Sequence, residues 1–121
     1  MDKKKLGNYG EDKAAAYLRR KGYKIVDRNF SCRFGELDIV AQKGPYIVFA
    51  EVKLRKNDAY GEAKEFVTAA KQRRIISAAL LWLAQNNCEM QPRFDVIEVY
   101  APEGENTRKA EIKHIEDAFG A

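Results

Sequence analysis

The chain has 121 residues, of which 45% are hydrophobic and 33% are charged, and its formal net charge at pH 7 is +4. This length predicts one domain over residues 1–121. Two cysteines are too few for a disulfide framework. The single histidine, His114, argues against a His-rich zinc site and a Ser-His-Asp triad. No apolar run of eighteen residues occurs and no apolar signal region follows Met1–Lys5, so we expect a cytoplasmic protein and not a membrane protein.

The first predicted element is a helix that Asn8 can cap and that Gly22 can stop. Glu11 then falls in its first turn, where a carboxylate interacts favourably with the helix dipole. A short strand over residues 23–28 follows.

Two β-rich segments come next, at residues 36–41 and 46–53. The residues between them include a Gly-Pro pair at positions 44 and 45, which is a turn signal, so we expect a β-hairpin centred on that pair. This register places Asp38 opposite Glu51.

The same register places Glu36 opposite Lys53, so four charged groups crowd onto one face of the sheet. Two carboxylates that face each other, Asp38 and Glu51, are destabilising unless a cation or a shared proton compensates them. Carboxylate oxygens suit Mg²⁺ or Mn²⁺, and Lys53 supplies a cation where charge would develop during attack on a phosphate. The alternative is a solvated strand edge, but the apolar residue Phe49 shares this face, and charge beside apolar surface needs a partner.

After the hairpin, polar residues 56–61 predict a loop beside the proposed site. A second helix is expected over residues 68–85, with Thr68 as its cap and with Ile76, Leu80 and Leu83 spaced along one face.

Residues 93–100 predict a strand, and residues 112–115 predict a short strand at a sheet edge that contains His114. A helix between two strands suggests a crossover that returns the chain to the same sheet. Cys32 and Cys88 are expected to be free thiols with a packing role.

Basic residues concentrate in the first hundred positions, which carry nineteen basic and thirteen acidic residues. This excess suits a polyanion such as nucleic acid, although a merely solubilising surface explains charge equally well. The basic residues best placed to reach a phosphate are Arg55, Lys56, Lys71 and Arg74, for which a solvated surface is the alternative role.

Several short motifs, taken together, resemble a known family. They are G-x-x-G-E at 7–11, K-G-Y at 21–23, R-N at 28–29, G-E-L-D at 35–38, V-F-A-E-V-K-L-R at 48–55, Lys71, and R-F-D-V-I at 93–97. This combination resembles the YraN-type uncharacterised bacterial protein family, and the order of its acidic residues resembles the PD-(D/E)XK nuclease superfamily. The resemblance implies a three-layer, restriction-endonuclease-like α/β fold with a mixed central β-sheet flanked by helices.

That family is similar to the archaeal Holliday junction resolvases, which are dimeric nucleases. The resemblance implies that Asp38 and Glu51 bind a metal, that the carbonyl of Val52 completes the coordination, and that Lys53 orients or activates water. Glu11 matches the helix-borne acid of the resolvases and would be a further ligand, directly or through water.

Glu36 would then be a neighbouring group paired with Lys53. The activity implied is a Mg²⁺- or Mn²⁺-dependent endonuclease that cuts branched or structured DNA, acting as a homodimer. Two other functions stay open from the sequence: a nucleic-acid-binding module with little catalysis, and an interaction component of a DNA repair assembly.

Overall fold

The computed structural model describes the backbone of residues 3–56 and 67–120 and the side chains of residues 8–56 and 67–120. In chain order the elements are α1 (Lys3–Arg20), β1 (Lys24–Cys32), β2 (Gly35–Lys43), β3 (Tyr46–Arg55), α2 (Ala69–Gln85), β4 (Gln91–Tyr100), the short 3₁₀ helix η2 (Gly104–Asn106) and β5 (Glu111–Phe119). Of the predicted loop over residues 56–61, residues 57–61 lie outside the described residues. Neither helix in the described part combines the length and apolar character needed to cross a membrane.

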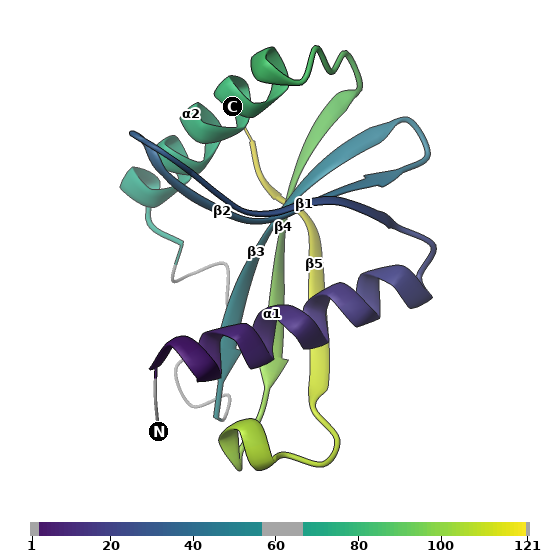
Figure 1. Ribbon diagram of the computed structural model, residues 1–121, viewed down its shortest axis with the longest axis vertical. Helices are drawn as coiled ribbons and strands as arrows, with labels where there is room; N and C mark the ends of the chain where they lie inside the picture. The colour runs from purple at the N-terminus through teal and green to yellow at the C-terminus, as the bar shows by residue number, and fades with distance from the viewer. Residues whose placement is uncertain (1–2, 57–66, 121) are drawn as a thin grey trace.

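A five-stranded sheet in the order β1-β2-β3-β4-β5 forms the middle of the molecule. Strands β3 and β4 run parallel, and the other neighbouring strands run antiparallel. Helix α2 connects the parallel pair, as a crossover must. The predicted crossover and the predicted edge position of the last strand are therefore confirmed (Figure 1).

The two helices cover opposite faces of this sheet (Figure 1). On β3, Ile47 and Phe49 pack in the core cluster that contains α2 residues, whereas Val48 and Ala50 pack in the cluster that contains α1 residues. This follows because successive side chains of a strand point to opposite faces. The result is the predicted three-layer α/β arrangement with a mixed sheet, consistent with a restriction-endonuclease-like fold.

Helix α1 begins earlier than the sequence predicts. It starts at Lys3, so Asn8 is not its cap but lies inside the helix. The lysines and the leucine before Asn8 are good helix formers and extend the helix toward its N-terminus. Its first turn contains no acidic residue, so Glu11 lies in mid-helix and the helix dipole does not explain it. The predicted stop is confirmed, since Gly22 has a φ of +88° just after the helix end.

Helix α2 confirms its predicted cap but not its predicted apolar face. The Oγ1 of Thr68 accepts a hydrogen bond of 3.1 Å from the N–H of Lys71. The buried residues of α2 are Ile75, Ala78, Ala79 and Trp82. They form the i, i+3, i+4, i+7 stripe of an amphipathic helix, and this stripe turns Leu80 outward, where it is 61% exposed. Ile76 and Leu83 are only partly buried at the margin of the core.

Strand β1 is longer than predicted and pairs antiparallel with β2 as far as Cys32. Beyond Arg28, apolar Phe30 and Cys32 alternate with polar Asn29 and Ser31, so the strand pattern continues past the predicted end. Asn29 has a φ of +56°, a left-handed conformation that asparagine tolerates better than most residues. Cys32 and Cys88 are free thiols packed against the core, as expected.

A buried acid on β4, Asp95, ties the α1 side of the sheet together. Its carboxylate is fully buried and accepts hydrogen bonds from Arg93 at 2.9 and 2.8 Å, and from the backbone N–H of Asp117 at 3.0 Å. His114 Nε2 lies 2.6 Å from the same carboxylate, and His114 Nδ1 lies 3.1 Å from the hydroxyl of Tyr17 on α1. Burial alone would raise the pKa of Asp95, but its hydrogen bonds to His114 and Arg93 outweigh burial and hold the pKa below its usual value.

We expect Asp95→Asn to destabilise the protein by about 3 kcal/mol at pH 7, because the substitution leaves the guanidinium of Arg93, which is 12% exposed, without its nearest charge partner. A lowered carboxyl pKa contributes stability above the unfolded pKa, and this contribution is lost as pH falls through the folded value. The difference between the two proteins should therefore shrink below about pH 4. Urea denaturation at pH 7 and pH 3, with the exposed Glu111→Gln as control, measures it. A difference that persists unchanged at pH 3 would contradict this account.

Candidate active site

The site lies where β2 and β3 separate. Among the described residues, their ladder runs from the pair Lys43–Tyr46 to the pair Ile39–Ala50, which is the predicted register. Asp38 follows directly after the last pair. Its Oδ2 accepts a hydrogen bond of 2.8 Å from the N–H of Val52. Beyond the last backbone pair, a side chain of β2 therefore still bonds to the backbone of β3.

Asp38 and Glu51 lie against each other, as the register predicts. The two carboxyl groups are within hydrogen-bonding reach, and Glu51 is only 7% exposed. Burial, and next the charge of Glu51, raise the pKa of Asp38 to about 8, although the hydrogen bond from Val52 acts in the opposite direction. The contact with a second carboxyl group therefore disfavours the charged form of Asp38, and a cation bound beside it would favour that form.

Two more acids approach Asp38 from its other side. One carboxylate oxygen each of Glu11, Glu36 and Asp38 lie within 4.8 Å of one another, a grouping that can hold a metal ion. Glu36 is thus a member of an acidic cluster, and the predicted pair of Glu36 with Lys53 is not part of the β2–β3 ladder. The reason is that the strands part at Asp38, so pairing by strand register no longer applies to Glu36.

Glu11 reaches the cluster from α1 and has an incomplete set of partners. Its Oε1 is buried, with no hydrogen-bond partner among the described residues. The guanidinium of Arg28 is 3.8 Å away and is engaged by Asp12 at 2.7 Å. Burial raises the pKa of Glu11, and the charge of Arg28 offsets this only in part. A buried acceptor without a hydrogen-bond partner calls for an explanation, and a role as a metal ligand is one such explanation.

Asn29 is a site residue for which the sequence predicts no role. It lies between the pairs Arg28–Ile39 and Phe30–Leu37, and therefore faces Asp38 across the β1–β2 ladder. Its side chain is within hydrogen-bonding reach of the Glu11 carboxylate. The left-handed backbone of Asn29 interrupts the regular strand at this point, and a strained backbone conformation is a feature found at functional sites. The signal in the sequence is the Arg-Asn pair at 28 and 29, which is one of the motifs of the family resemblance but to which no role was assigned.

Two lysines supply the positive charge. Lys71 Nζ forms an ion pair of 2.9 Å with Glu51 Oε1 and lies within hydrogen-bonding reach of Lys53. Burial, and then the contact with Lys71, lower the pKa of Lys53. Burial would also lower the pKa of Lys71, but its contacts with Lys53 and Glu51 outweigh burial and raise it. Lys71 is therefore the ammonium that neutralises Glu51.

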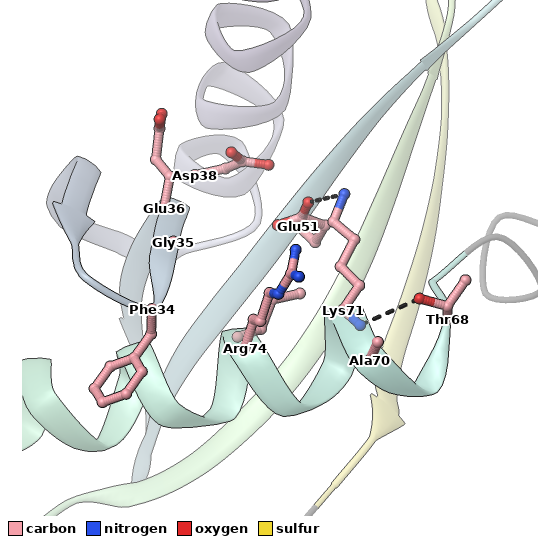
Figure 2. Close-up of a pocket in the computed structure, with 10 residues that line it drawn as sticks. Phe34, Gly35, Glu36, Asp38, Glu51, Thr68, Ala70, Lys71 and Arg74 are labelled. Atoms are coloured by element: carbon pink, nitrogen blue, oxygen red, sulfur yellow. Dashed lines mark hydrogen bonds and ion pairs between the residues drawn. The ribbon is translucent and has the colours of Figure 1, made fainter.

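An open pocket of about 620 Å³ gives access to these groups. Its lining consists of Phe34, Gly35, Glu36, Asp38, Glu51, Thr68, Ala70, Lys71, Arg74 and Ile75. Figure 2 shows the acids on the sheet side and the two basic residues on α2. Since a liquid water molecule occupies about 30 Å³, the pocket has room for a hydrated cation and a phosphate group.

The predicted nucleic-acid-binding residues divide into two groups. Lys71 and Arg74 line the pocket from α2. Arg55 is 11% exposed and donates a hydrogen bond of 3.1 Å to the fully buried Glu98, so its guanidinium supports the end of β3. Lys56 is exposed at the end of the same strand.

The donor set fits a hard divalent cation. Asp38 belongs both to the contact with Glu51 and to the cluster with Glu11 and Glu36, so it is the carboxylate common to every arrangement. The buried Oε1 of Glu11, which has no hydrogen-bond partner among the described residues, points to the same conclusion. Oxygen donors without histidine or cysteine suit Mg²⁺ or Mn²⁺ better than zinc.

Comparison with known proteins identifies one family. The model of the uncharacterised protein family UPF0102 matches residues 10–99. A UPF0102 protein of Geotalea uraniireducens is 47% identical over 119 residues, covering 98% of this chain and 91% of the relative. A UPF0102 protein of Geobacter sulfurreducens is 49% identical over 115 residues, covering 94% and 88%. A UPF0102 protein of Caldanaerobacter subterraneus is 44% identical over 121 residues, covering 98% of each.

We expect Asp38→Asn to stabilise the metal-free protein by roughly 1–2 kcal/mol at pH 8, because it removes a half-buried charge that faces Glu51 yet keeps an acceptor for the N–H of Val52. A carboxyl whose folded pKa is raised loses stability as pH rises from its unfolded value to its folded one. The advantage of the variant should therefore fade between pH 8 and about pH 4.

Urea denaturation with EDTA at several pH values checks this expectation. The exposed Glu89→Gln is the control and should follow the wild type. If Asp38→Asn is less stable than the wild type at pH 8 without metal, the two acids do not repel each other as described.

Proposed function

The chain belongs to the uncharacterised protein family UPF0102, and from the geometry of its acidic pocket we propose that it is a metal-dependent endonuclease that hydrolyses phosphodiester bonds of DNA. The observation that carries the proposal is the contact of Asp38 with Glu51 in a pocket that also presents Lys71 and Arg74. Metal-assisted phosphodiester cleavage requires carboxylates that bind a cation and basic side chains that bind a phosphate, and the pocket presents both.

Asp38 and Glu51 would hold the metal, with Glu11 as a further ligand. Mg²⁺ or Mn²⁺ bound there would supply an activated water and neutralise charge on the phosphate. The carbonyl of Val52 is a suitable additional ligand because the N–H and C=O of a strand residue point to the same side, and the N–H of Val52 points to Asp38. Lys53 would orient the attacking water and stabilise negative charge that develops on the phosphate.

Arg74 and Lys71 would bind the phosphate backbone, with Lys56 at the end of β3. These contacts position DNA but do not read its sequence, because they address phosphates and not base edges. The excess of basic over acidic residues in the first hundred positions supports such a polyanionic substrate.

Branched or structured DNA is the substrate class that we propose, by similarity to the Holliday junction resolvases. The three-layer fold and the order of Glu11, Asp38, Glu51 and Lys53 along the chain support placement in the PD-(D/E)XK nuclease superfamily. Resolution of a junction by paired cuts requires a homodimer, which we propose as the active form.

The alternative is a DNA-binding module without catalysis. One observation favours it: the ammonium of Lys71 itself neutralises Glu51. The cleavage experiment below separates the two functions.

We expect the protein to cut a labelled four-way junction in Mg²⁺ or Mn²⁺ but not in EDTA. Asp38→Ala should abolish cutting because the common ligand is lost, and Lys53→Ala should lower the rate by about 10²–10³-fold, as for removal of one group that stabilises the transition state. Flap, linear duplex and single-stranded DNA of equal length serve as competing substrates, and product formation on denaturing gels gives the rates.

Lys24→Ala, which removes an exposed lysine at the start of β1, is the matched control and should keep the wild-type rate. Salt-sensitive binding without cutting by the wild-type protein would exclude the nuclease and favour the binding module. No binding at moderate salt would exclude both.

We expect Arg74→Ala to weaken DNA binding on all sequences alike, because Arg74 would contact a phosphate. The slope of log affinity against log salt should fall by about 0.9 for the one lost contact with duplex DNA. Fluorescence anisotropy in EDTA at several salt concentrations measures the slope. Arg20→Ala, at the exposed end of α1, is the charge-matched control. An equal loss in both variants would show that net charge matters and the pocket does not.

A further inference from the structure

Glu51 has a partner that a metal ion would have to replace. Lys71 Nζ lies 2.9 Å from Glu51 Oε1, and the two side chains are 40% and 8% exposed, respectively. Figure 2 shows this ion pair in the pocket, between a residue of β3 and one of α2. A divalent cation held by Asp38 and Glu51 would place two positive charges beside the ammonium, which like charge would drive away.

The backbone of Lys71 is fixed while its side chain has room to move. Its N–H donates to the cap residue Thr68, so the first turn of α2 holds the Cα of Lys71 in place. The side chain extends from this anchor into the open pocket and is 40% exposed. It can therefore leave Glu51 without any change in the helix.

We propose that Lys71 is an exchangeable counter-ion of the metal site: it neutralises Glu51 until a divalent cation binds, and the cation then releases it toward the substrate phosphate. This inference rests on the metal site of the proposed function. It makes Lys71 a positioning residue whose state depends on metal occupancy.

The released ammonium would join Arg74, which follows three residues later on α2 and lines the same pocket. Residues three apart on a helix are neighbours, so the two cations can address one phosphate backbone together. Metal binding would then raise DNA affinity by adding one phosphate contact, in addition to its own charge. Metal and DNA would favour each other's binding, as linkage requires.

The test measures Mn²⁺ affinity by electron paramagnetic resonance, without DNA, for the wild type, Lys71→Met, Lys71→Arg and Arg73→Met. We expect Lys71→Met to bind Mn²⁺ about tenfold more tightly, because the charged partner of Glu51 no longer competes. Lys71→Arg retains the competing charge and should bind no more tightly than the wild type. Arg73→Met removes an equal charge from an exposed residue two positions further along α2 that does not line the pocket, and it should change affinity less than twofold.

A second readout is the salt slope of binding to a phosphorothioate-substituted duplex with and without Mn²⁺. The wild type should gain about 0.9 in slope on addition of Mn²⁺, beyond any change seen in Lys71→Met. Mn²⁺ affinity in Lys71→Met that equals or falls below that of Arg73→Met overturns the inference. Absence of Mn²⁺ binding in all four proteins overturns it together with the metal site, whereas tighter Mn²⁺ binding by Lys71→Met without any DNA cutting by the wild type overturns the nuclease alone.

Discussion

The candidate site depends on one constraint, the placement of Asp38 against Glu51 where β2 and β3 stop pairing. A regular ladder would have ended these strands with backbone hydrogen bonds, but here the side chain of Asp38 accepts the bond from the N–H of Val52. This bond holds one carboxylate beside another that is almost fully buried. Burial and the charge of Glu51 raise the pKa of Asp38 to about 8, so the charged form of Asp38 is unfavourable here and a bound cation would favour it.

The three layers explain why so many charged groups reach this one place. The strands alternate between the α1 face and the α2 face, and both cores are filled by apolar residues of the middle strands. At the open end of the β2–β3 pair, α1 delivers Glu11 from one side and α2 delivers Lys71 and Arg74 from the other. No single element holds the site, which is why it assembles only when the sheet and both helices are in place.

The sequence predicted what local rules determine. The Gly-Pro turn set the hairpin register, and the register set Asp38 beside Glu51. It did not predict the ion pair of Lys71 with Glu51, since this depends on how α2 crosses the sheet. The mid-helix position of Glu11 was missed because Asn8 resembles a cap, although the lysines before it propagate a helix. The pairing of Glu36 with Lys53 stays a prediction, because the last pair of the β2–β3 ladder is Ile39–Ala50 and strand register does not extend to Glu36.

The partners and pKa shifts of the acids distinguish a structural acid from those of the candidate site. Asp95 has Arg93, His114 and a backbone N–H as partners, and its pKa lies below the usual value, so it is stable as a carboxylate. Asp38 is half-buried, and its pKa is raised to about 8. Glu11 also has a raised pKa, and its Oε1 has no hydrogen-bond partner among the described residues, with the guanidinium of Arg28 3.8 Å away. The same chain thus surrounds the carboxylate of Asp95 with hydrogen-bond donors and leaves Asp38 and Glu11 with raised pKa values. Since the fold can supply such donors, the contrast supports the metal site that we propose at Asp38 and Glu11.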